Sequence, residues 1–161
     1  MGPRIAAFAA VSASMAAAGS CAAPSAPVSA LMLSGTADPL VPYGGGQVGF
    51  ANRRSRGSVL SVEESARRWR ELDKLPAAPS SVRELPHRLA ADPTRVTRTV
   101  WGADPAGLQV ELLRVEGGGH VEPSQSQRLG ALYLRLVGPQ NADLETAEKA
   151  WAFFREKRAR P

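Results

Sequence analysis

Two apolar segments that each run directly into a glycine-containing loop place the strongest constraint on how this chain folds. Residues 30–33 form a short apolar run that continues into Gly35 and Asp38, and the alternating run 108–115 leads through three glycines to His120. Both runs predict β-strands. Loops at the carboxyl ends of strands in open α/β sheets face one common crevice, so we expect Asp38 and His120 to be functional residues.

The three glycines before His120 allow backbone conformations that a larger residue would forbid, as a catalytic histidine on a tight turn requires. The same four residues are also compatible with a surface loop that carries a solvated histidine. Asp38 favours the catalytic interpretation, because a carboxylate just beyond a strand can orient a histidine. Asp38 and His120 are therefore the predicted catalytic residues.

The segments around these two residues resemble the acid and histidine segments of α/β-hydrolase esterases. The group that they resemble most is the poly(3-hydroxybutyrate) depolymerase and feruloyl esterase family. The two matching motifs are Gly-Thr-Ala-Asp-Pro-Leu-Val-Pro-Tyr-Gly-Gly at residues 35–45 and Gly-Gly-Gly-His at residues 117–120. The resemblance covers nearly the whole chain, since it extends to residues 59–75, 121–124, 141–145 and 151–154.

The resemblance implies an α/β fold, namely the C-terminal part of an α/β-hydrolase domain with parallel strands and flanking helices. Residues 1–161 would be one portion of a single domain, with 76–95 as an irregular connection. α/β hydrolases run in the order nucleophile, acid, histidine, and residues 4–11 resemble the strand that follows the nucleophile helix. Because no Gly-x-Ser-x-Gly occurs, we expect the N-terminal strands and the nucleophile elbow to be absent from this chain.

A carboxylic ester hydrolase of the serine-triad type, polyhydroxybutyrate depolymerase-like or feruloyl esterase-like, is the function that the resemblance implies. His120 would take the proton of the serine and later activate water, while Asp38 would fix the imidazole tautomer. The substrate would be a small ester or a polyester, and no metal or organic cofactor is required. Residues 121–124 replace the tryptophan and proline-glycine of many depolymerases, which favours a smaller, soluble ester. Without the missing N-terminal half, the chain should be inactive.

Residues 1–21 have an alternative interpretation as an export signal. Arg4 would be its charged end, and Ala18-Gly19-Ser20-Cys21 resembles a lipoprotein cleavage site. The stretch has no leucine, several serines and a single basic residue, which predicts weak membrane affinity. The alternative function is a non-catalytic exported protein, lipoprotein-like or dedicated to interactions. The family resemblance suggests secretion, and the sequence otherwise leaves the localisation open.

Composition and motif spacing disfavour other classes of protein. Proline, glycine or charge interrupts every apolar run before it could cross a bilayer, so no stable membrane span is predicted. Cys21 is the only cysteine, so the chain forms no intrachain disulfide and, with just His87 and His120, no cysteine-rich zinc site. The net charge of +5 is spread over several segments without an aromatic platform, so no nucleic-acid partner is predicted. The basic segments are residues 52–56, 67–70 and 155–160.

Helical spacing predicts three helices. Ser61 and Glu64 form a capping box at the start of the first, in which each side chain would satisfy an amide of the other residue. The second lies within residues 127–137, and the third begins near Asn141 or Asp143. The predicted apolar sides consist of Val62, Ala66, Trp69 and Leu72, then Leu129, Leu132, Leu136 and Val137, and finally Leu144, Ala147, Trp151 and Phe154.

Residues 96–101 and 108–115 both alternate between apolar and polar side chains and are separated by a short glycine- and proline-containing turn. This arrangement predicts an antiparallel hairpin. We expect Trp69 and the apolar side of the last helix to be buried, and His87 to lie on the surface of the irregular connection.

Overall fold

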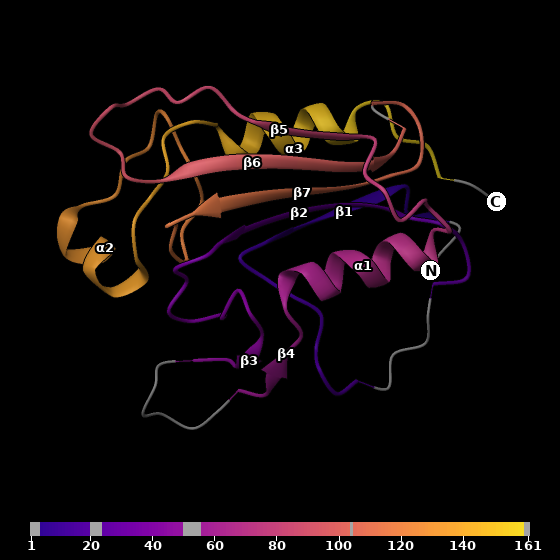
Figure 1. The fold of residues 1–161 in the computed structure, drawn as a ribbon, viewed down its shortest axis with the longest axis horizontal. Coiled ribbons are helices and arrows are strands. Elements are labelled where there is room, and N and C mark those ends of the chain that lie inside the picture. The colour runs from indigo at the N-terminus through magenta and orange to yellow at the C-terminus, as the bar shows by residue number, and fades with distance from the viewer. Residues whose placement is uncertain (1–3, 20–23, 50–55, 104, 160–161) are drawn as a thin grey trace.

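A five-stranded sheet with helices on both faces forms the centre of the molecule (Figure 1). The computed structural model describes residues 4–19, 24–49, 56–103 and 105–159. The order of the strands across the sheet is β1 (Ala7–Val11), β2 (Ser29–Gly35), β7 (Gln109–Glu116), β6 (Arg95–Gly102) and β5 (Ser81–Glu84). A separate two-stranded ribbon pairs β3 (Gly46–Gln47) with β4 (Ser58–Val59).

Three neighbouring strands of the sheet point in the same direction. β1 pairs with β2 in parallel, with Val11 beside Leu33, and β2 pairs with β7 in parallel, with Leu33 beside Leu113. β6 and β5 then extend the sheet with antiparallel pairs. The carboxyl ends of β1, β2 and β7 therefore lie at one common edge.

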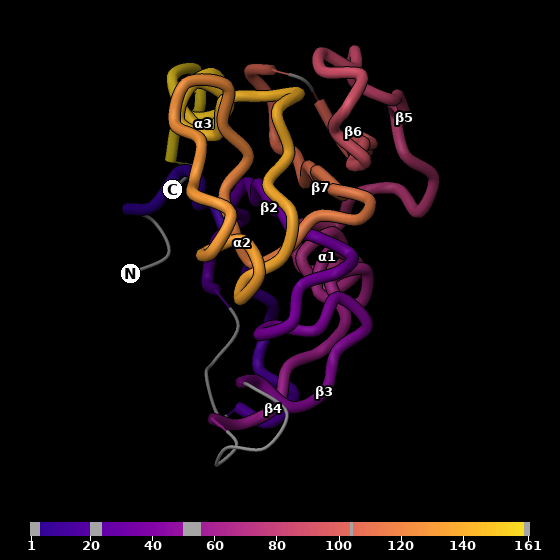
Figure 2. The backbone as a smooth tube through the Cα atoms, turned by 90° about the vertical axis from the view of Figure 1, so that its left-hand side faces the viewer, coloured from indigo at the N-terminus to yellow at the C-terminus, as the bar shows by residue number. Residues whose placement is uncertain are grey.

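Burial of the strands follows from their positions between the helices. All seven residues of β2 are buried, because α1 (Val62–Leu72) covers one face of the sheet and α3 (Thr146–Phe154) the other (Figure 2). Met32 belongs to the core on the α1 face, while Leu31 and Leu33 belong to the core on the α3 face. A strand buried on both faces carries an unbroken apolar run rather than an alternating one.

The predicted capping box at the start of α1 is formed only in part. Ser61 Oγ accepts a hydrogen bond from the Glu64 amide at 3.0 Å. The Glu64 carboxylate accepts instead from Arg67 and Arg68, and these hydrogen bonds lower its pKa to about 2. Trp69 packs on the core as predicted, whereas Leu72 is exposed, so that part of the predicted apolar face was wrong.

The predicted fold class, the C-terminal part of an α/β-hydrolase domain, is wrong. In the described residues, antiparallel strand pairs outnumber parallel ones by three to two, and there are three short helices. Short connections join β5 to β6 and β6 to β7, whereas a parallel pair needs a crossover of a dozen or more residues. The chain is a small β-rich domain with a mixed sheet.

Several element boundaries also differ from the predictions. The connection 76–95 contains β5, whose four residues are all exposed at the sheet edge. The second helix, α2 (Ala131–Val137), is shorter than predicted and buries Val137 alone. The last helix begins at Thr146, several residues later than expected, and its Trp151 is 67% exposed, so the predicted burial of Trp151 was wrong. The predicted hairpin is confirmed as β6 and β7.

No helix in the described ranges is long and apolar enough to cross a membrane. The predictions that involve Met1, Cys21, most of the basic segment 52–56, and Arg160 lie outside the described residues.

Candidate functional site

Asp38 lies in the turn that follows β2, and its carboxylate is fixed by the backbone beside it. Oδ1 accepts hydrogen bonds from the amides of Leu40 (2.8 Å) and Val41 (2.9 Å). Such bonds from residues two and three positions on are typical of aspartate in a turn. The side chain is 1% exposed. Its second oxygen, Oδ2, is left to face the histidine loop.

The loop that follows β7 crosses over the end of β2. The Ala37 amide donates to Gly118 O at 2.9 Å, and a Cβ on Gly35 would lie 2.2 Å from the same oxygen. On the other side, a Cβ on Gly119 would lie 2.1 Å from Val137 O. Of the three loop glycines, Gly117 alone has a positive φ, of 70°. At Gly118 and Gly119, close packing against neighbouring atoms, rather than a positive φ, requires glycine.

His120 and Asp38 meet at the end of this loop. His120 Nδ1 lies 2.9 Å from Asp38 Oδ2, so the ring donates to a nearly buried carboxylate. The His120 side chain remains 33% exposed. The structure therefore brings the two predicted site residues together, in the geometry of the acid and histidine of a hydrolytic triad.

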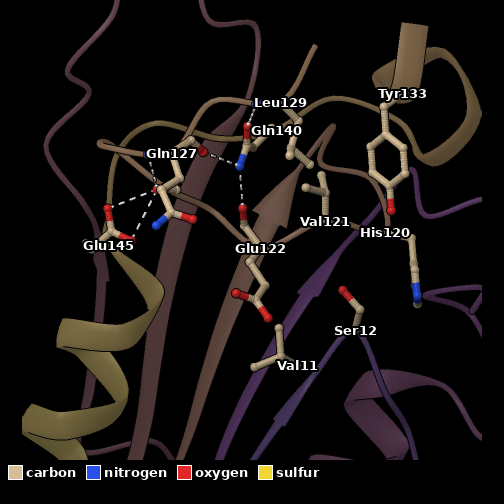
Figure 3. A pocket seen from close by; sticks show the side chains of 11 residues that line it. Val11, Ser12, His120, Val121, Glu122, Gln127, Leu129, Tyr133, Gln140 and Glu145 are labelled. Atoms are coloured by element: carbon tan, nitrogen blue, oxygen red, sulfur yellow. Dashed lines mark hydrogen bonds between the residues drawn. The ribbon is translucent and has the colours of Figure 1, made fainter. Parts of the chain in front are cut away.

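His120 borders a pocket of about 350 Å³ at the carboxyl edge of the parallel strands (Figure 3). Ser12, which follows β1, lines this pocket together with His120 and Glu122. Tyr133 reaches it from α2, and Leu129 from the segment before that helix. The remaining lining residues are Val11, Val121, Ser124, Gln127, Gln140 and Glu145.

The far wall of the pocket is held by a dense set of hydrogen bonds. Gln140 Nε2 donates to Glu122 O (2.9 Å) and Gln127 O (3.1 Å). The Glu145 carboxylate accepts from the amides of Gln125 and Ser126, and these bonds hold the pKa of Glu145 below its ordinary value. Ser124, Gln125 and Ser126 are thereby tied to the segment before α3, and the pocket has a defined wall.

A second histidine is also paired with an aspartate but lies outside this pocket. His87 Nδ1 is 3.0 Å from Asp143 Oδ1, which also accepts from the Arg88 amide at 2.9 Å. His87 Nε2 is buried and has no hydrogen-bond partner among the described residues. His87 was expected on the surface of its connection. In the structure it is only 21% exposed, and its pairing with Asp143 joins the connection before β6 to the segment before α3. It does not offer its second nitrogen to a ligand.

A buried ion cluster joins the sheet to α3. Arg98 on β6 donates to both carboxylate oxygens of Glu111 on β7, at 2.8 and 2.7 Å, and Lys149 Nζ lies 2.9 Å from Glu111 Oε1. The side chains of Arg98 and Glu111 are nearly completely buried. Because the partners saturate the carboxylate, we assign the cluster a structural role.

Sequence reasoning missed Ser12, Glu122 and Tyr133 as pocket residues. Ser12 directly follows a predicted strand, and that position was the one available signal. Among the described residues, no group of three histidine, cysteine or acidic side chains could hold a metal ion. Comparisons with protein-family models, with curated proteins and with solved structures returned no match.

Proposed function

We propose that this protein is an ester hydrolase of the serine-triad type, with Asp38 as the acid and His120 as the general base. The observation that carries the proposal is the 2.9 Å contact between His120 Nδ1 and the buried Asp38 carboxylate, at the border of a pocket. The resemblance of residues 35–45 and 117–120 to esterase segments adds separate support.

The chemistry of the pair follows from its hydrogen bonds. The Asp38 side chain is held in one orientation, because its rotation would break the two hydrogen bonds that Oδ1 accepts from backbone amides. Donation of Nδ1–H to Asp38 Oδ2 leaves the lone pair on His120 Nε2 free to accept a proton. When Nε2 takes a proton from an attacking hydroxyl, the adjacent carboxylate stabilises the resulting imidazolium. His120 can then return that proton to the leaving alkoxide.

The pocket favours a small, uncharged ester. Apolar contacts are available from Val11, Val121 and Leu129, and the ring of Tyr133 stands on the α2 side (Figure 3). No lysine or arginine is among the described residues that line it. A negatively charged substrate would therefore gain no ion pair here.

The alternative, a non-catalytic exported protein cleaved before Cys21, has less support. Cleavage there would remove β1, which pairs with β2 over five residues. It would also remove Phe8 from the core on the α1 face, and Ala7 and Val11 from the core on the α3 face.

Hydrolysis of p-nitrophenyl acetate tests the proposed roles, because an activated ester reports general-base catalysis even when the natural acyl group is unknown. We expect His120→Gln to lower kcat/KM roughly 10²–10⁴-fold, the usual contribution of general-base catalysis. Gln keeps a donor for Asp38 but has no basic nitrogen. Asp38→Asn should also lower the rate, because an amide favours the wrong histidine tautomer.

His87→Gln is the matched control, since His87 also pairs with an aspartate but does not line the pocket that His120 borders. Its rate should equal that of the wild-type protein. Equal rates for wild-type and His120→Gln proteins, both shown to be folded by circular dichroism, would refute the proposal.

A further inference from the structure

Ser12 has a backbone conformation that the local fold does not explain. Its φ is +48°, and the other non-glycine residue with positive φ in the described ranges is Lys74, at +54°. Lys74 comes just after the C-cap of α1, where a left-handed residue is common. Ser12 follows a strand instead. Strained residues of this kind concentrate at functional sites.

The topology brings Ser12 to the same edge as the Asp38 and His120 pair. β1, β2 and β7 are parallel neighbours, and Ser12, Asp38 and His120 lie just beyond the carboxyl ends of these three strands. The histidine loop crosses over the end of β2 through the Gly118 contacts and so extends toward β1. Ser12 and His120 consequently line one pocket, and Figure 3 shows the Ser12 hydroxyl pointing toward the middle of it, with His120 at its border.

The hydroxyl of Ser12 is available for chemistry, whereas that of the other pocket serine is not. The Ser12 amide donates to Leu33 O at 2.8 Å and anchors the backbone, while its hydroxyl makes no hydrogen bond within the described residues. Ser124 Oγ, by contrast, donates to the Glu145 carboxylate and accepts from the Gln127 amide at 2.8 Å. Of these two serines, only Ser12 has a hydroxyl not already engaged.

We propose that Ser12 is the nucleophile that His120 activates, an inference that rests on the proposed function. Ser12 Oγ attacks the ester carbonyl carbon while its proton passes to His120 Nε2. The carbon–oxygen bond to the alcohol then breaks, and the alkoxide takes that proton. Water attacks the acyl carbon of the acyl-Ser12 ester while His120 Nε2 takes a proton from it. The bond between that carbon and Ser12 Oγ then breaks, His120 Nε2 returns the proton to Ser12 Oγ, and the carboxylic acid is released.

This assignment departs from two sequence expectations: that the nucleophile is absent, and that residues 4–11 correspond to the strand after the nucleophile helix rather than to the strand that bears the nucleophile. Ala10 and Ser14 occupy the positions that glycines hold in Gly-x-Ser-x-Gly, so the motif search did not find Ser12. Both residues are small, and chain order is preserved, since Ser12 precedes Asp38 and Asp38 precedes His120.

A fluorophosphonate probe tests the assignment on the full chain, because such probes react with serines activated by a general base. We expect one adduct by intact mass, mapped to Ser12 by peptide sequencing. Labelling should fall at least tenfold in Ser12→Gly and in His120→Gln, and persist in the control Ser81→Ala, because Ser81 is exposed on the edge strand β5 and does not line the pocket. Glycine is chosen because it adopts a φ of +48° without strain, so Ser12→Gly should remain folded.

Two results would overturn the assignment: no adduct on folded wild-type protein, or an adduct that persists in Ser12→Gly. Hydrolysis of p-nitrophenyl acetate separates this failure from that of the proposed function. If the rate depends on His120 but not on Ser12, His120 keeps its proposed role as general base, and Ser12 is excluded as the nucleophile. A rate that depends on neither residue would refute both proposals.

Discussion

At the scale of single residues, close packing of glycines positions His120. The loop passes between the turn after β2 and the end of α2. A Cβ on Gly118 would lie 2.5 Å from Val115 Cγ1, and a Cβ on Gly119 would meet the Val137 carbonyl. The His120 amide donates to that carbonyl at 2.6 Å. A side chain at these positions would displace the ring from Asp38.

We therefore expect Gly119→Ala to destabilise the protein by about 1–3 kcal/mol, as overpacking commonly does, and, under the proposed function, to lower p-nitrophenyl acetate turnover strongly. Gly44→Ala is the control, because a Cβ at Gly44 meets no atom within 4 Å. Thermal unfolding and p-nitrophenyl acetate turnover measure the two effects. An unchanged melting temperature and rate in Gly119→Ala would contradict this prediction, because the loop would then accommodate a Cβ without loss of stability.

At the residue scale, the sequence predicted that Asp38 and His120 lie close together, whereas their catalytic role stays a prediction. Asp38 and His120 were predicted from their place after strands and are in contact. Ser12 was missed because a positive φ at a serine leaves no mark in residue type, apart from the small residues beside it. The need for Gly118 and Gly119 was predicted for the wrong reason, since neither has a positive φ.

At the scale of elements, α2 is unusual because it leaves its apolar side chains outside the core. Leu132 is 77% exposed, and Leu136 and Tyr133 are more than half exposed. The tertiary contacts of this short helix bury Val137 alone. Tyr133 uses the exposed side to line the pocket.

We expect Tyr133→Ala to raise KM for p-nitrophenyl butyrate roughly 5-fold or more, because loss of apolar contact with substrate costs about 1–3 kcal/mol. The melting temperature should change little, since the side chain is half exposed. Leu132→Ala serves as the control on the same helix, because Leu132 does not line the pocket. Equal KM values for wild-type and Tyr133→Ala proteins would exclude Tyr133 from substrate binding.

Element predictions succeeded for segments whose pattern reflects burial on one face or both. β2, β6 and β7 carry such patterns and were predicted. β5 was missed, because an exposed edge strand packs neither face and needs no apolar alternation. The last helix was predicted to bury Trp151, but it begins at Thr146 and instead buries Phe153. Tertiary packing, rather than helical spacing alone, selects the buried side.

At the scale of the whole molecule, a polar network ties together segments far apart in the chain. Asp143 accepts from the Arg88 amide, from His87 and from Asn141 Nδ2 (3.1 Å). Asn141 also donates to Thr94 Oγ1 at 2.7 Å. Burial opposes the ionisation of Asp143, yet the hydrogen bonds outweigh it and hold the pKa of Asp143 below its ordinary value.

A carboxyl group whose pKa is lower in the folded state stabilises the fold above its unfolded pKa, about 3.9 for aspartate. That stabilisation disappears as the pH falls through the lower, folded-state pKa. We expect Asp143→Asn to cost about 1–3 kcal/mol at pH 7, and the difference from wild type to narrow below about pH 4. Urea unfolding at pH 7 and pH 3 measures both values. A difference that is independent of pH would contradict this assignment.

The whole fold was less predictable than its parts. Two loop motifs located Asp38 and His120, but they do not determine the direction of β5 and β6, which depends on the length of the connections between them. The ion cluster of Arg98, Glu111 and Lys149 also could not be predicted from the sequence, since its members are spread over β6, β7 and α3. Nonlocal pairings of this kind leave no periodic signal in sequence.

Under the proposed function, the charge of the pocket has a consequence for product release. Glu122 and Glu145 line it, and none of its described lining residues is cationic, although the chain as a whole carries a net charge of +5. Hydrolysis of a neutral ester yields a carboxylic acid, which is ionised at neutral pH. The product therefore acquires the same sign of charge as the wall that surrounds it. Repulsion would speed its departure and oppose its return, so the free acid should be a poor inhibitor.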